Sequence, residues 1–104
     1  PALSVFLGSK YFGGEVEYVM AGSGHIAGVV NPPAARKYQY WTGARPVGDF
    51  AEWVSKATEH PGSWWPHWQG WIEAKDNTRV PARIPGNHMK TLGDAPGSYV
   101  KVRV

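Results

Sequence analysis

The segment "EVEYVMAGSGHIAGVV", from Glu15 to Val30, joins a short polar–apolar alternation to a glycine-rich run with one histidine. Over residues 15–18, glutamate alternates with valine and tyrosine, and a period of two is typical of a half-exposed strand at the edge of a sheet. The three glycines that flank His25 favour a loop, because glycine accepts backbone conformations that bulkier residues avoid. The segment therefore predicts a strand that ends in a loop presenting His25.

Helices are expected on both sides of this strand. Before it, apolar residues recur with the spacing of one helical face, at Leu3, Phe6, Leu7 and Tyr11. Gly13–Gly14 are expected to end that helix, since glycine adopts the left-handed conformation of a helix C-cap. After the loop, Pro32–Pro33 stop regular structure, and residues 34–48 are expected to form an irregular connection.

Two amphipathic helices are expected after residue 48. Asp49 is the expected N-cap of the first, whose apolar stripe consists of Phe50, Trp53, Val54 and Ala57. A break at residues 60–62 separates the two, and Ser63 is the expected cap of the second. Its apolar face consists of Trp64, Trp68, Trp71 and Ile72.

The last third of the chain differs in character from the rest. Residues 76–104 are polar and interrupted by proline and glycine until "SYVKVRV", whose alternation predicts a short final strand. We therefore expect an α/β fold, with residues 1–75 as its body and 76–104 as an irregular extension ending in that strand. The final strand is the one parallel neighbour this chain offers to the strand before His25, so part of the sheet is expected to lie outside it.

Length and composition narrow the classes of protein. The 104 residues suffice for one domain, and 42% hydrophobic with 18% charged residues is a globular composition. No apolar run reaches the roughly 20 residues of a membrane-spanning helix. The chain begins with proline, and its N-terminal apolar patch lacks a basic leader, so we expect a processed or partial chain without a signal peptide.

Cysteine is absent, which excludes disulfides, thiolate zinc sites and a cysteine nucleophile within these residues. The net charge of +3 is mild, and the basic residues gather only at Arg36–Lys37 and at Lys101 with Arg103. We therefore expect no nucleic-acid partner. Arg36–Lys37 is most simply a solvated pair.

His25 has two interpretations. A histidine after the carboxyl end of a strand lies where open α/β sheets place reacting groups, and imidazole can take and return a proton near neutral pH. The alternative is a surface histidine in a glycine-rich turn. A catalytic histidine needs a nucleophile and a carboxylate, but Asp49 is better explained as a cap, and Asp76 and Asp94 lie in loop-like stretches. Its partners are therefore expected outside this chain.

Other chemistry is less well supported. His25, His60, His67 and His88 lack the spacing of a metal site, so no metal is expected. The tryptophans could form a sugar or base platform, but their helical spacing favours core or interface packing. Trp65 lies off the main stripe and is the expected partner-facing aromatic.

Four strings together resemble the C-terminal part of class I polyhydroxyalkanoate synthases, over about Val5 to Val104. They are "GSGHIAGVVNPP" (22–33), "YWT" (40–42), "ATEHPGSWWPHWQGWI" (57–72) and "APGSYVKVRV" (95–104). The "EHPGSWWPHW" block is especially uncommon, and the strings occur in the family's order. The resemblance implies the C-terminal portion of an α/β-hydrolase fold.

The resemblance also implies an activity. Family members are acyltransferases that polymerise 3-hydroxyacyl-CoA into polyester, releasing CoA, through a cysteine–aspartate–histidine triad. The family's triad histidine carries over to His25, while its cysteine and aspartate lie outside this chain. Gly22, Ser23 and Gly24 support the loop without a chemical role. Asn31 either lines the acyl-CoA approach or, more simply, forms a turn before Pro32–Pro33.

Further expectations follow from the same resemblance. They are acyl-CoA as substrate with no cofactor, the remainder of the synthase and the polyester chain as partners, a homodimer of the full enzyme, and a cytoplasmic location on polyester granules. A protein of another class remains possible from the residues alone: a non-catalytic, tryptophan-rich binding or interaction module. Exposed apolar faces left by missing sheet neighbours would also favour self-association.

Overall fold

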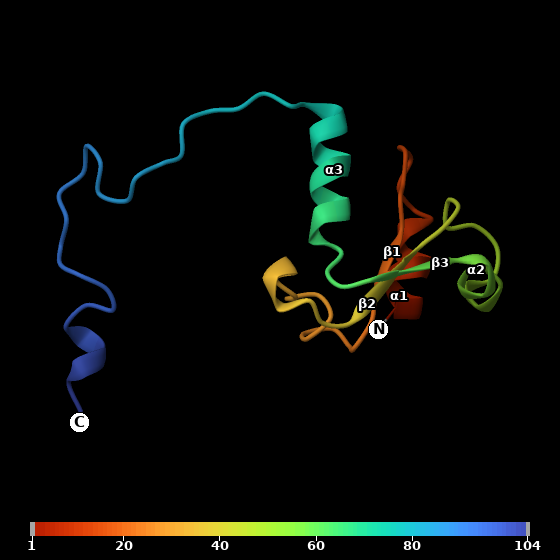
Figure 1. The fold of residues 1–104 in the computed structure, drawn as a ribbon, viewed down its shortest axis with the longest axis horizontal. Helices are drawn as coiled ribbons and strands as arrows, with labels where there is room; N and C mark the ends of the chain where they lie inside the picture. Colours follow the sequence, from red (N-terminus) through yellow and green to blue (C-terminus); the bar gives the residue numbers. More distant parts are fainter. Residues whose placement is uncertain (1, 104) are drawn as a thin grey trace.

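The computed structural model describes residues 2–103 and confirms a small α/β arrangement (Figure 1). Its helices and strands are α1 (Ala2–Ser9), β1 (Val19–Ala21), β2 (Gln39–Thr42), α2 (Phe50–Lys56), β3 (Thr58–Pro61) and α3 (Trp65–Lys75). Two 3-10 turns, η1 (Pro33–Ala35) and η2 (Tyr99–Lys101), complete the regular structure of these residues. The body holds every element except η2, which lies on the distant C-terminal segment.

The sheet is antiparallel, with strand order β1-β2-β3. Met20 pairs with Trp41, and Trp41 pairs with Glu59 on the other side. The expectation of an irregular connection over residues 34–48 is therefore wrong in its middle, where tyrosine, tryptophan and threonine favour an extended backbone. The expectation of a parallel strand that has only the C-terminal residues as a neighbour is also wrong, because β2 takes that place beside β1.

Three aromatic side chains form the buried core. Phe6 of α1 is 0% exposed, and its ring meets the Tyr18 ring edge-on at 5.4 Å. The Tyr18 ring in turn meets that of Trp53 in α2 at 4.8 Å. The Tyr18 hydroxyl donates to the Ala2 carbonyl at 2.9 Å, and burial raises the pKa of that hydroxyl. This cluster holds α1 and α2 against the strand that leads to His25.

Helix α2 begins as expected. The Asp49 carboxylate accepts hydrogen bonds from the backbone N–H groups of Ala51 at 2.7 Å and Glu52 at 3.3 Å. These bonds satisfy two N–H groups that a helix start leaves without intrahelical partners. Trp53 then enters the core, and its indole N–H donates to the Ala44 carbonyl at 2.7 Å.

Helix α1 ends earlier than expected, at Ser9 instead of Gly13–Gly14. The buried Ser9 hydroxyl donates to the Phe6 carbonyl at 2.7 Å, and such side-chain bonding competes with helix continuation. Tyr11 consequently lies outside the helix and is 90% exposed.

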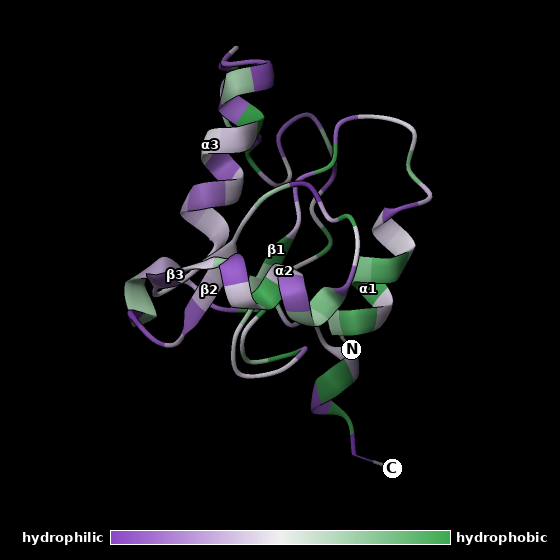
Figure 2. Cartoon of the chain, turned by 90° about the vertical axis from the view of Figure 1, so that its right-hand side faces the viewer, coloured by the Kyte–Doolittle hydropathy of each residue, from purple (hydrophilic) through white to green (hydrophobic). Residues whose placement is uncertain are grey.

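Helix α3 carries its expected apolar face without burying it among the described residues. Trp68, Trp71 and Ile72 are 49%, 40% and 41% exposed. By residue hydropathy α3 is mainly hydrophilic, whereas α1 is mainly hydrophobic (Figure 2). A hydrogen bond and an ion pair hold α3 to the segment before β1: the His67 ring bonds the Glu17 carboxylate at 2.6 Å, and Lys75 pairs with Glu15 at 2.9 Å.

Beyond Lys75 the chain leaves the body along an extended path (Figure 1). The expected strand over "SYVKVRV" is absent from its described part, where Tyr99–Lys101 form the turn η2. No strand of the described body lies beside this segment, so its alternating valines have no ladder to join.

The Asp49 cap gives a stability prediction. Asp49→Ala should lower the free energy of unfolding by about 1 kcal/mol, because two helix N–H groups lose their acceptor. Asp49→Asn should change it by only a few tenths of a kcal/mol, since asparagine caps almost equally well. Urea unfolding followed by circular dichroism measures both. Equal losses in the two variants would contradict the capping role.

Candidate functional site

His25 lies on a loop that leaves the end of β1. We call residues 22–30 the histidine loop; it contains consecutive turns, and His25 is exposed on it. The Val30 N–H donates to the Ile26 carbonyl at 2.8 Å, and the Gly28 N–H donates to the Gly24 carbonyl at 3.2 Å. Within residues 2–103, no hydrogen bond or ion pair engages the His25 ring, so the imidazole is open to a partner.

The start of the histidine loop is attached to the sheet. The Gly22 N–H donates to the Gln39 carbonyl at 2.8 Å, which extends the β1–β2 ladder by one bond. The backbone then reverses through Ser23 and Gly24, whose φ angles are 64° and 85°. A left-handed conformation is uncommon for serine and easy for glycine. The loop thus leaves the strand through a sharp bend.

A close contact between two glycines closes the loop on itself. A Cβ atom at Gly28 would lie 1.6 Å from the Gly22 carbonyl oxygen and 2.9 Å from that of Gly24. No side chain fits there without displacement of the backbone. Both Gly22 and Gly28 are buried, whereas His25 between them is exposed. The glycines expected to support the loop therefore do so through direct packing of main chain on main chain.

Side chains hold the far end of the loop. The Val29 carbonyl accepts the indole N–H groups of Trp64 at 3.1 Å and Trp65 at 2.9 Å. Asn31 is 3% exposed, and its amide donates to the Lys37 carbonyl at 2.8 Å. Asn31 therefore braces the chain after the loop through a bond that spans six residues, and not through the turn before Pro32–Pro33 that the sequence suggested.

The expectation for Trp65 needs correction. Trp65 was the expected partner-facing aromatic, but it is half-buried and its indole N–H is bonded within the chain. Helical spacing could not predict this contact with Val29, because the position of Val29 depends on how the histidine loop folds back.

Three aspartates of this chain could in principle orient His25: Asp49, Asp76 and Asp94. Asp49 caps α2. A hydrogen bond from the Thr78 side chain, together with one from the Thr78 backbone N–H at 2.7 Å, lowers the pKa of Asp76. Asp94 lies in the C-terminal segment between α3 and η2. The described residues thus bring none of the three into hydrogen-bonding contact with His25.

The sequence did not predict the contacts of a second histidine, His60, with side chains of β2. His60 Nε2 lies 2.8 Å from the Thr42 hydroxyl, and its ring stacks on that of Tyr40 with centroids 4.9 Å apart. Tyr40 and His60 are also paired in the β2–β3 register. A sequence prediction of β2 would have indicated that Tyr40 and His60 pair. Over the described part of the chain, no three His, Asp or Glu side chains converge as a metal site requires.

The ion pairs of α3 also change local titration. A hydrogen bond from Lys75, together with its charge, lowers the pKa of Glu15. The carboxyl of Glu73 likewise has a lowered pKa, first through a hydrogen bond from Gln69 and then through Arg79. A hollow of about 340 Å³ lies between α3 and residues 76–79, and its lining does not include His25.

Gly28 tests the loop geometry directly. Gly28→Ala should destabilise the protein by about 1–3 kcal/mol, because the added methyl overlaps the Gly22 carbonyl and the loop must shift. Gly70→Ala is the matched control, since a Cβ at Gly70 has nothing within 4 Å and alanine favours a helix. Urea unfolding measures stability, and the His25 ring resonances report loop position. Unmoved resonances with unchanged stability in Gly28→Ala would contradict the contact.

None of the described helices is long and apolar enough to cross a bilayer. No protein-family model matches the chain. Curated proteins do match it, and among them are poly(3-hydroxyalkanoate) polymerases from several bacteria.

Three of these relatives show the range of similarity. The chain is 64% identical over 103 residues to the poly(3-hydroxyalkanoate) polymerase subunit PhaC of Rhizobium meliloti. It is 58% identical to the polymerase of Methylorubrum extorquens and 33% identical to the PhaC subunit of Cupriavidus necator. Each match covers 99% of this chain, which spans only 17% or 18% of the relative's length. The chain is thus homologous over nearly all its residues to the C-terminal region of poly(3-hydroxyalkanoate) polymerases.

Proposed function

We propose that this chain is the part of a polyhydroxyalkanoate synthase that supplies the triad histidine, His25. The whole protein would transfer 3-hydroxyacyl groups from CoA to a growing polyester and release CoA. The observation that carries the proposal is the exposed, unbonded imidazole on a loop whose two ends are both held by the fold. The similarity to polymerases over the full chain supports it and does not favour a free-standing binding module.

The geometry suits a proton-transfer group. Both His25 nitrogens are free to engage groups from outside the described residues, so one could meet a nucleophile and the other an orienting carboxylate. A rigid loop keeps such a base in place, and proton transfer depends on heavy-atom separations of about 2.6–3.2 Å. The small residues around His25 leave room for a partner surface to approach.

The proposed step uses a cysteine from outside this chain. His25 takes the proton of the cysteine thiol, and the resulting thiolate attacks the thioester carbonyl of 3-hydroxyacyl-CoA. A new enzyme thioester forms while the bond to the CoA sulfur breaks, and the proton leaves with the CoA thiol. The orienting aspartate also belongs to the remainder of the synthase. No cofactor takes part.

The wider architecture forms part of the same proposal. Residues 1–75 would complete the C-terminal portion of an α/β-hydrolase fold, and residues 76–104 would be an extension of it. A homodimer of the full enzyme, located in the cytoplasm on polyester granules, is the proposed assembly. The exposed Trp68, Trp71 and Ile72 on α3 would then contact the remainder of the synthase.

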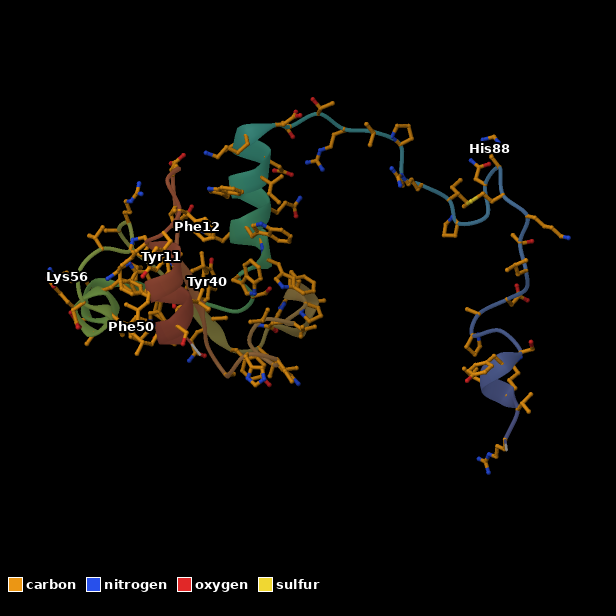
Figure 3. All side chains as sticks on the ribbon, turned by 180° about the vertical axis from the view of Figure 1, so that it is seen from behind. Tyr11, Phe12, Tyr40, Phe50, Lys56 and His88 are labelled. Atoms are coloured by element: carbon orange, nitrogen blue, oxygen red, sulfur yellow. The ribbon has the colours of Figure 1, made fainter. Side chains whose placement is uncertain are left out.

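Substitution of His25 in a complete polymerase is the main test. His25→Ala should reduce CoA release from 3-hydroxybutyryl-CoA by at least about 10²-fold, because the thiol loses its base. His88→Ala is the matched control, since His88 is another exposed histidine and lies on the extended segment far from the loop (Figure 3). Near-normal turnover in folded His25→Ala would exclude the proposed role.

The 104-residue chain itself provides a second test. Purified alone, it should release no CoA above the spontaneous rate of hydrolysis, because it contains no cysteine to attack the thioester. A thiol-reagent assay for free CoA measures this. Release that is catalytic in this chain and lost in His25→Ala would show that a different nucleophile is present, contrary to the proposed division of the triad.

A further inference from the structure

Trp64 and Trp65 stand out because two consecutive side chains donate to one main-chain oxygen. Their indole N–H groups reach the Val29 carbonyl at 3.1 and 2.9 Å. An indole N–H can only donate, and a carbonyl oxygen has two lone pairs, so the two bonds use its full accepting capacity. Val29 is one residue before the end of the histidine loop. The pair therefore acts on the main chain that carries His25.

The start of α3, which holds these tryptophans, is itself fixed to the sheet. The Gly62 N–H donates to the Tyr38 carbonyl at 2.7 Å, which continues the β2–β3 ladder past its last pair. The buried Ser63 hydroxyl then accepts the Trp65 N–H at 3.1 Å. Trp64 consequently takes a helical conformation, with φ −74° and ψ −12°, so its side chain can reach the same oxygen as that of Trp65.

These contacts hold the histidine loop at both of its ends. Its first residue, Gly22, is bonded to Gln39 of β2, and its penultimate residue, Val29, is bonded to the start of α3. Both anchors are connected to the same antiparallel sheet: Gln39 belongs to β2, and α3 starts a few residues after β3. A loop held at one end can swing, whereas a loop held at both ends keeps its tip in place.

We propose that Trp64 and Trp65 are positioning residues for His25, acting through the Val29 carbonyl. The inference rests on the proposed function, in which His25 is the proton-transfer group. The indole N–H groups, more than the ring surfaces, carry the effect, because they fix the direction of the Val29 peptide. The Val29–Val30 peptide is part of the turn that is closed by the hydrogen bond from the Val30 N–H to the Ile26 carbonyl. Ile26 directly follows His25 in the chain.

The test uses Trp→Phe variants in a complete polymerase, because phenylalanine keeps an aromatic ring and removes the N–H. Each single variant leaves one donor on Val29, so only a small fall in kcat is expected. The double variant should lower kcat for CoA release by about 10- to 100-fold with KM within about two-fold, since a misplaced base slows the reaction without weakening substrate binding. Trp41→Phe is the matched control, because Trp41 is half-buried in β2 and its indole N–H makes no hydrogen bond among the described residues.

Two further measurements separate positioning from folding. Circular dichroism and thermal unfolding establish the folded fraction, and rates are expressed per folded molecule. If the double variant does not fold, both tryptophans are replaced by benzothienylalanine, which keeps the bicyclic shape and has sulfur in place of N–H. The same fall in kcat is then expected.

The outcomes distinguish this inference from the proposed function. If His25→Ala is inactive and the double variant keeps kcat within two-fold of Trp41→Phe, the positioning role is overturned and the proposed function stands. A loss that disappears after correction for the folded fraction also overturns it. If folded His25→Ala retains turnover, the proposed function fails and the positioning role fails with it.

Discussion

The main-chain contact between Gly22 and Gly28 is the constraint on which the arrangement around His25 depends. Because glycine has no Cβ, the main chain at Gly28 can pack directly on Gly22, and the loop turns back onto the strand end within a few residues. This return brings Val29 to the two tryptophans and places Asn31 in a buried position facing Lys37. A loop without this contact would have to take a wider path, and its far end would lose those partners.

The small aromatic core fixes the strand from which the histidine loop starts, although this part of the chain has few residues. Phe6, Tyr18 and Trp53 join α1, the residue before β1, and α2 into one aromatic cluster. Tyr18 directly precedes β1, so burial of its ring fixes the strand from which the loop leaves. Edge-on aromatic contacts add about 0.5–1.5 kcal/mol each beyond the burial of their area. The core and the loop therefore share one anchored strand.

Much of the local structure could be predicted from the sequence. Asp49 and the stripe that follows it predicted α2 correctly, and the glycines around His25 predicted the loop after β1. The first helix was placed correctly but given too long an extent, since the Ser9 hydroxyl bond that ends it leaves no periodic signal. These elements depend on nearby residues, and so local patterns suffice to find them.

Non-local contacts were harder to predict. Strand β2 was missed because its residues do not alternate, and all four are half-buried in the central position between β1 and β3. Without β2 neither the antiparallel sheet nor the pairing of Tyr40 with His60 could be anticipated. The double bond to the Val29 carbonyl needs the folded loop and the fixed start of α3 together. Of the site, the sequence identified His25 and its supporting glycines, but none of the bonds that hold the loop's far end.

The role of His25 as a base is tested most directly by the pH dependence of cysteine alkylation in a complete polymerase. If His25 draws the proton from the nucleophilic thiol, iodoacetamide should inactivate the enzyme rapidly at pH values well below the ordinary thiol pKa of about 8.5. In His25→Ala the rate should then follow an ordinary thiol and rise only toward pH 8 to 9. Identical pH profiles for the two proteins would contradict that role.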